Sequence, residues 1–182
     1  DEAEKVRREH RELVEDSLRK AEEALKRLDE LIKRTEKRVK DVEEELKRLI
    51  KRVLDEVRKN REKREDIRRL VKELRDKVRE IEDEMRKMNE EVRREVKKVE
   101  DDLRRTNREL HEKVKDVERK LKGDEVKRRL RTSDKKVSEK HKELLDRLRE
   151  LLRRHHESLK RLEERIRKLV TDATRRIEEE EK

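Results

Sequence analysis

The spacing of apolar residues constrains this chain more than any other feature of its sequence. Apolar side chains recur at alternating steps of four and three residues, so that the pattern repeats every 18 residues. Five helical turns of 3.6 residues have this length, whereas a left-handed supercoil has a period of 3.5 residues. The same spacing occurs in two further stretches, around Ser17 and Val137, so the sequence predicts three straight helices with narrow apolar seams. The seam in the middle of the chain consists of Leu74, Val78, Ile81, Met85, Met88, Val92, Val96, Val99, Leu103, Thr106, Leu110, Val114, Val117 and Leu121.

The composition excludes most other architectures. Charged residues make up 63% of the chain and hydrophobic residues 27%, with no Phe, Tyr, Trp, Pro or Cys and a single Gly. Sheets and barrels depend on turn residues and large apolar side chains that this chain lacks. No apolar run exceeds two residues, so neither a membrane span nor a signal peptide is expected. We therefore predict an all-α protein that is soluble, and cytoplasmic in an expression host.

Interruptions of the seam predict where the chain turns. The longest stretch without an apolar residue, 58–66, contains Asn60, and the only glycine is Gly123. Asn and Gly most readily take the left-handed conformation after a helix, and cations before and anions after each break suit helix ends. We expect a single antiparallel, up-down-up three-helix bundle over residues 1–182. Its helices are expected at about residues 2–59, 62–121 and 125–180.

Two other arrangements remain open on the sequence alone. In the first, one or two longer helices pair between chains, and Asn60 is a polar position in the core of an intermolecular coiled coil. In the second, the connection after Gly123 extends to Asp134, because residues 131–134 resemble an N-cap before Val137.

Scarce polar residues within the seams align in the antiparallel arrangement. Facing residue numbers should add to about 123 for the first two helices and to about 246 for the last two. A buried polar group without a partner costs about 1–3 kcal/mol, so such groups should meet at the same level. We expect each level to form a hydrogen-bond network that fixes the helix register. The three levels are His10, His111 and Ser133; Ser17, Thr106 and His141; and Thr35 and Asn89 with His155 or Ser158.

No catalytic, cofactor-binding or metal site is predicted. The few serines and histidines fit the packing levels better than a nucleophile and base, and no phosphate-binding glycine loop or EF-hand motif occurs. Only the level of His10 and His111 holds two histidines, which is too few for a metal centre. Protonation of a buried histidine would disrupt its level, so a pH-responsive switch is an alternative function.

The net charge of +10 does not by itself indicate a partner. The 62 Lys and Arg are interleaved with 52 Asp and Glu, as where Lys47 and Arg48 follow residues 43–45. The basic cluster at 126–131 indicates only weak adhesion to nucleic acid, because no aromatic residue can stack on a base. Membrane-surface binding is disfavoured because the apolar stripe is narrow and lacks Trp or Phe. We expect a monomer that requires no cofactor and no partner, with a homo-oligomeric or partner-binding coiled coil as the alternative.

Together these features resemble computationally designed, parametrically generated three-helix bundles with buried hydrogen-bond networks. The resemblance extends over the whole chain and includes the seam, the near-equal helix lengths, the Leu, Val and Ile interior and the matched polar levels. It implies a thermostable scaffold with untwisted helices and no catalytic residues. The connections depart from it, because they lack Gly-, Ser- or Pro-rich loops. Spectrin-like repeats share the topology but normally carry a core Trp, which is absent here.

Overall fold

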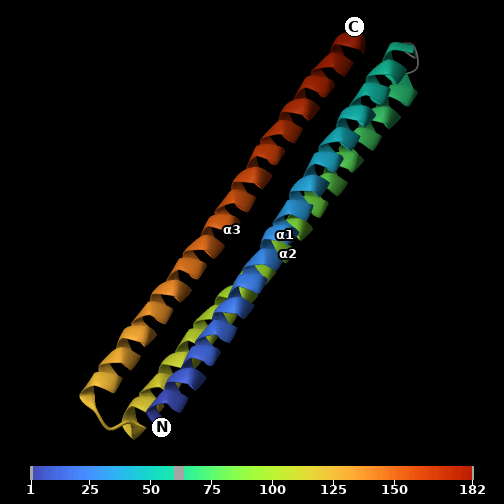
Figure 1. Cartoon of the computed structure of the whole chain (residues 1–182). Helices are drawn as coiled ribbons and strands as arrows, with labels where there is room; N and C mark the ends of the chain where they lie inside the picture. Colours follow the sequence, from blue (N-terminus) through green and yellow to red (C-terminus); the bar gives the residue numbers. More distant parts are fainter. Residues whose placement is uncertain (1, 60–63, 182) are drawn as a thin grey trace. The chain divides into compact units, whose positions relative to one another are not determined.

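The computed structural model describes residues 2–59 and 64–181 of the chain. Over these residues the chain forms three α-helices, which Figure 1 shows in sequence colours. All regular secondary structure in this part of the chain is helical, which confirms the all-α fold class. The turn predicted at Asn60 lies outside the described residues. The helices are α1 (Glu2–Lys59), α2 (Arg64–Lys120) and α3 (Asp124–Glu181).

Charges at the helix ends match the helix dipole at both connections. The last turns of α1 and α2 carry basic residues, and the first turns of α2 and α3 carry acidic residues. Each such charge near a helix end contributes about 0.3–1 kcal/mol at low ionic strength. These residues are Arg58 and Lys59, Glu65 and Asp66, Arg119 and Lys120, and Asp124 and Glu125.

The connection between α2 and α3 is short and depends on Gly123. This glycine has a φ of 127°, in the region that side chains other than glycine rarely adopt. Before it, the Leu121 amide donates to the Val117 carbonyl at 3.1 Å, and after it the Lys127 amide donates to the Gly123 carbonyl at 3.3 Å. These bonds satisfy backbone groups at the end of α2 and the start of α3.

The longer connection up to Asp134 does not form. Residues 124–134 belong to α3 instead. Thr132, which would belong to the N-cap sequence, donates its hydroxyl to the Arg128 carbonyl at 3.0 Å, one turn earlier in the same helix. The seam residues Val126 and Leu130 maintain the helical spacing through this region, and Leu130 is buried.

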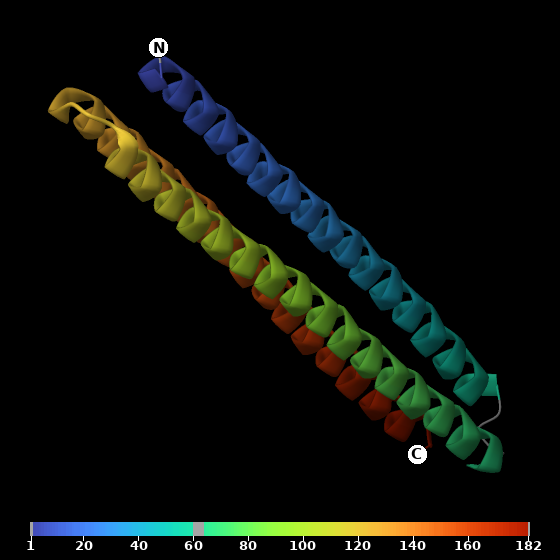
Figure 2. The same cartoon turned by 90° about the horizontal axis from the view of Figure 1, so that it is seen from below.

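The helices contribute to two compact units, and the segments of each can be followed by colour in Figures 1 and 2. The first unit consists of Asp1–Leu31 and Val92–Arg153, and the second of Ile32–Glu91 and Arg154–Lys182. Each unit therefore contains a segment of α1, of α2 and of α3. The expectation of a single bundle over residues 1–182 stays a prediction.

Each unit has its own three-helix core. In the second unit one cluster of buried side chains draws on all three helices, with Leu46 and Leu162 fully buried. In the first unit the buried side chains of α1, α2 and α3 follow the same four-and-three spacing, and Leu144 is fully buried. The first-unit core includes Ala21, Leu25, Leu28, Val92, Val96, Val99, Leu103, Leu110, Val114, Leu130, Val137, Leu144 and Leu148.

Polar contacts between helices are consistent with the antiparallel prediction in the second unit. In the second unit α1 contacts α2 through the Arg38–Glu84 ion pair and through Glu45 and Lys77 at 4.0 Å, so residue numbers rise along α1 as they fall along α2. In the same unit α1 contacts α3 through two ion pairs whose numbers rise together. These pairs are Glu43–Arg165 at 3.1 Å and Arg58–Glu180 at 3.4 Å.

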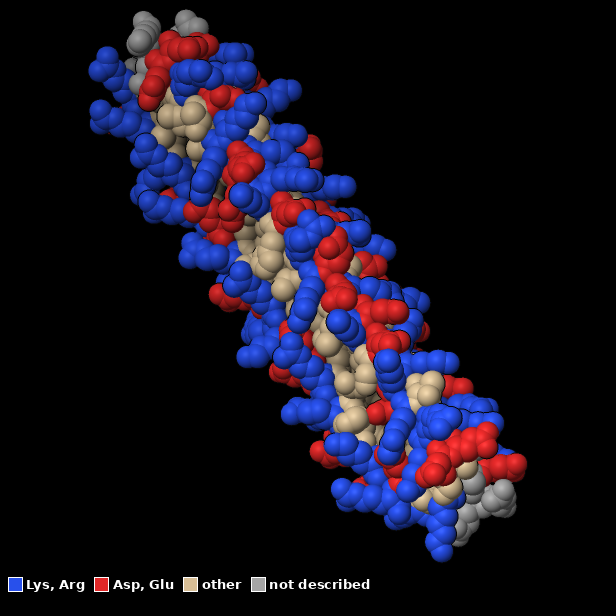
Figure 3. Space-filling model, turned by 90° about the vertical axis from the view of Figure 1, so that its left-hand side faces the viewer, with Lys and Arg blue, Asp and Glu red and all other residues tan. Residues whose placement is uncertain are grey.

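Charged side chains dominate the surface. Figure 3 shows Lys and Arg interleaved with Asp and Glu on the viewed face, with other residues visible in narrow openings between them. Leu13 is the one exposed large apolar side chain in the described part of the chain, at 40%. None of the helices, within the residues described, combines the length and apolar character needed to cross a membrane.

Candidate functional site

The level predicted from Ser17, Thr106 and His141 lies in the first unit. Ser17 and Thr106 line one surface hollow between α1 and α2, and His141 is buried at 1% exposure. Beside them the Ser138 hydroxyl donates to the Asn107 amide oxygen at 3.5 Å, which places Thr106 and His141 within about one turn of each other on α2 and α3. The three helices therefore present these residues at a similar height.

The hydrogen bonds expected between these three residues are not formed. The Thr106 hydroxyl donates to the Asp102 carbonyl at 2.7 Å, and Nδ1 of His141 contacts the Val137 carbonyl at 3.0 Å. Within the described residues, Ser17 Oγ and His141 Nε2 are buried and have no hydrogen-bond partner. Thr and His side chains in a helix can bond either a neighbouring helix or the carbonyl four residues earlier in their own helix. Thr106 and His141 both bond the carbonyl of their own helix.

The level predicted from His10, His111 and Ser133 contains a different partner. Nδ1 of His111 lies 2.6 Å from Oδ2 of Asp134, which joins α2 to α3. Asp134 follows Ser133 by one residue, and only 14% of its side chain is exposed. The carboxylate is the stronger acceptor, so the structure corrects the predicted partner of His111 from Ser133 to Asp134.

The two histidines of this level differ in environment. His10 is 8% exposed, whereas 49% of the His111 side chain is exposed. Burial lowers the pKa of His10 below its ordinary value of 6.5, and the negative charge of Asp134 opposes this effect. The neutral imidazole is therefore favoured at His10.

The third level lies in the second unit. Thr35 and His155 are buried, at 8% and 1% exposure, whereas Asn89 and Ser158 are half-buried. Asn89 Oδ1 is buried and, within the described residues, has no hydrogen-bond partner. The adjacent Met88 is itself 9% exposed and belongs to the core cluster, so an apolar side chain occupies the core position of α2 beside Asn89. His155 and the neighbouring His156 have ring centroids 5.9 Å apart and tilted by 46°.

Several polar contacts were not predicted from the sequence. The sequence pattern places Asp134 only in an N-cap, and it does not predict the bond between Asn107 and Ser138 because both residues flank the seam. Glu43, whose side chain is only 12% exposed, contacts Lys47 as the sequence predicts, and it also contacts Arg165 of α3, which the sequence does not predict. A search for polar pairs one residue outside the seam would have found these contacts.

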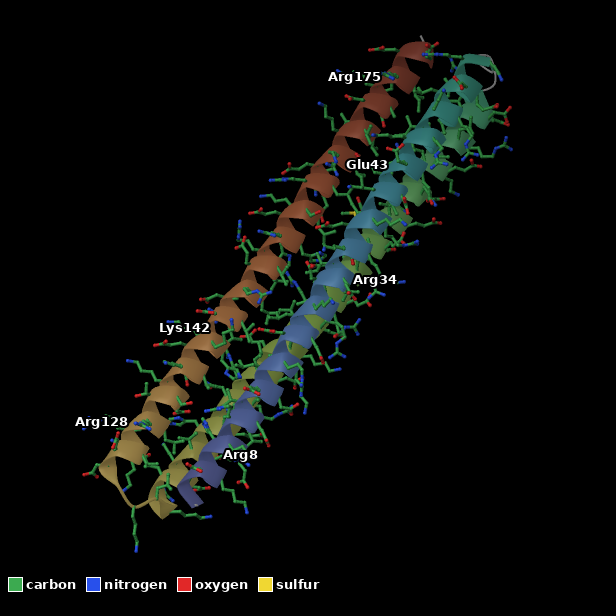
Figure 4. All side chains as sticks on the ribbon, in the orientation of Figure 1. Arg8, Arg34, Glu43, Arg128, Lys142 and Arg175 are labelled. Atoms are coloured by element: carbon green, nitrogen blue, oxygen red, sulfur yellow. The ribbon has the colours of Figure 1, made fainter. Side chains whose placement is uncertain are left out.

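Surface charges pair mainly within their own helix. The recurring pair is an Asp followed three residues later by an Arg, with N–O distances from 2.7 to 3.9 Å. Exposed pairs of this kind contribute about 0.2–1 kcal/mol each. All five basic residues labelled in Figure 4 are exposed, namely Arg8, Arg34, Arg128, Lys142 and Arg175. The pairs are Asp16–Arg19, Asp66–Arg69, Asp83–Arg86, Asp102–Arg105, Asp116–Arg119 and Asp172–Arg175.

Groups with metal-ligating chemistry do not converge. Among the residues that the structure describes, no cluster of three or more His, Cys, Asp or Glu could hold a metal ion. The hollow that Ser17 lines is bordered by small residues of α1, by Val99 and Leu103 of α2, and by four charged residues. Those charged residues are Lys20, Arg27, Asp102 and Arg105.

Comparison with protein-family models gives no match, and a search of curated proteins finds no similar sequence. Among solved structures, one titled "Computationally designed three helix bundle" is similar to this chain, with a TM-score of 0.49 and 15% sequence identity. The alignment covers 99% of this chain and 84% of that chain.

Proposed function

We propose that this chain is a designed structural scaffold without a biochemical activity of its own, in which buried polar residues specify the helix register. The observation that carries the proposal is where three of its polar side chains find their hydrogen-bond partners. Thr106, Thr132 and His141 each bond a carbonyl four residues earlier in the same helix, so they do not converge on a common point. A catalytic or ligand-binding constellation requires such convergence.

The register role follows from the free energy that is lost when polar residues of neighbouring helices no longer face each other. A uniform apolar seam can slip by one turn and still bury similar side chains, so it specifies pairing weakly. A slip in the first unit would separate the polar pairs that join α2 to α3, which are His111 with Asp134 at 2.6 Å and Asn107 with Ser138 at 3.5 Å. Leaving such a polar group without its partner costs about 1–3 kcal/mol, which disfavours the slipped arrangement.

The mass in solution tests the scaffold proposal. We propose that the chain is a monomer, so light scattering at micromolar concentration should give 22.7 kDa. A single species of two or three times this mass would instead favour the homo-oligomeric coiled coil.

A pair of spin labels tests the register role. The chain has no cysteine, so Lys20→Cys and Lys142→Cys introduce two exposed labelling positions in the first unit. We expect one narrow distance distribution for this pair. Adding Asn107→Leu, His111→Leu and Ser138→Ala, which removes both polar pairs, should broaden the distribution or add a distance displaced by about one helical turn, ~5.4 Å.

The matched control changes three apolar residues of the same unit and retains both polar pairs between α2 and α3. Leu25→Ile, Leu103→Met and Leu148→Met conserve volume, so they should leave the distance distribution narrow. A distribution that also stays narrow in the variant with Asn107→Leu, His111→Leu and Ser138→Ala would contradict the register role.

A further inference from the structure

The first unit contains a hollow that the proposed scaffold role does not use. Its volume is about 330 Å³, and its lining comes from α1, from the connection before Gly123 and from α3. Pockets for small molecules span about 300–1,000 Å³, so this hollow suits a ligand at the small end of that range. Its apolar lining consists of Val14, Leu121, Val126 and Leu130.

The polar lining of the hollow is cationic or neutral. Arg11 and Arg129 are exposed at its border, His10 is buried, and Ser133 is half-buried. No acidic residue is among the described residues that line it. Four aliphatic side chains beside two guanidinium groups match a ligand with an alkyl tail and an anionic head.

We propose that this hollow binds a short single-chain alkyl anion. The tail lies along the aliphatic lining, where burial contributes about 0.8 kcal/mol for each methylene group removed from water. The head group lies at Arg11 and Arg129, whose planar guanidinium groups bind anions with two parallel hydrogen bonds.

Neighbouring charges are compatible with this placement. Arg129 forms an ion pair with Glu125 at 3.0 Å, but the two side chains are 63% and 76% exposed, so exchanging this pair for a ligand costs little. Asp134 of α3 is the acid that acts on His10, and it is already bonded to His111 of α2. The head group is therefore expected on the arginine side of His10, away from Asp134.

Calorimetric titration with octyl sulfate, below its micelle concentration, tests the site on the full chain. The test variant is Arg11→Gln with Arg129→Gln. The matched control is Arg8→Gln with Arg128→Gln, two exposed arginines labelled in Figure 4 that do not line the hollow. Both variants lose the same net charge. Octyl glucoside supplies the same tail without a charge.

We expect saturable one-to-one binding of octyl sulfate that falls about 5- to 25-fold in the test variant, since each exposed ionic contact is worth up to about 5-fold. The control should bind within about 2-fold of the unchanged chain. Equal losses in the two variants, octyl glucoside binding as tightly as octyl sulfate, or a lack of saturable binding would each overturn the proposal.

A pH series adds an independent readout. Octyl sulfate stays ionised from pH 8 to pH 5.5, so any change in affinity comes from the protein. Protonation of His10, which lines the hollow, should strengthen binding as the pH falls, and His10→Gln should remove this gain whereas His111→Gln retains it. A gain that persists in His10→Gln would overturn the placement of the head group beside His10.

Discussion

Two imidazoles of the first unit show how the surroundings of one residue decide its effect on stability. His141 is 1% exposed, its Nδ1 contacts the Val137 carbonyl, and its Nε2 has no hydrogen-bond partner among the described residues. We expect His141→Leu to raise the free energy of unfolding by about 1–2 kcal/mol, because an unsatisfied buried polar group is replaced by an apolar one. Urea denaturation followed by circular dichroism measures the change.

His111 provides the matched control for that substitution. Its ring is half exposed and bonds Asp134, so His111→Leu removes a partner from a carboxylate that is only 14% exposed. The same chemical change should therefore lower the free energy of unfolding. If both leucine variants gained stability equally, local satisfaction of the ring nitrogens would not explain the effect.

His10 predicts a pH dependence of stability. Burial holds its pKa in the folded chain below 6.5, with Asp134 opposing the shift. Between that lowered pKa and about 6.5 the unfolded chain binds more protons than the folded chain, so stability is present above pH 6.5 and is lost as the pH falls below it. Urea titrations at pH 7.5 and pH 5.5 measure this loss. It should be smaller in His10→Gln, and an equal loss would exclude His10 as the source.

At the scale of the element, the connection between α2 and α3 depends on one backbone angle. An added Cβ at Gly123 would meet nothing within 4 Å, so Gly123→Ala introduces no clash, but its φ of 127° is strained for alanine. We expect this substitution to lower the free energy of unfolding by about 1–2 kcal/mol in urea denaturation. Lys122→Ala, one residue earlier, has no positive φ and should change stability by less than about 0.5 kcal/mol. Equal effects of the two would argue against backbone strain.

The helices themselves could be predicted from the sequence because their signals are local. The four-and-three spacing and the charges around Gly123 depend on residues a few positions apart, and the predicted all-α class of three long helices is confirmed. The hydrogen-bond partners could not be predicted in the same way. Whether Thr106 bonds its own helix or a neighbour depends on its rotamer. Whether His111 meets Asp134 or Ser133 depends on how α3 is rotated about its own axis.

At the scale of the whole molecule, the two units share their helices. Each of α1, α2 and α3 passes from one unit to the other without interruption, between residues 31 and 32, 91 and 92, and 153 and 154. Starting a new helix is unfavourable, whereas extending an existing one is not. A helix formed in one unit therefore favours helix in the other, and the chain should unfold as one cooperative body.

Leu46→Ala tests this cooperativity. Leu46 is fully buried in the core of the second unit, so its truncation should lower the free energy of unfolding by about 2–5 kcal/mol. Native-state hydrogen exchange would then show the same loss of protection for core amides of residues 92–153 as for those of residues 32–91, because both exchange through global unfolding. Leu13→Ala, at an exposed position of the first unit, should change protection by less than about 0.5 kcal/mol in either unit. A loss confined to residues 32–91 and 154–182 would mean that the units unfold separately, and that continuity of the helices does not couple them.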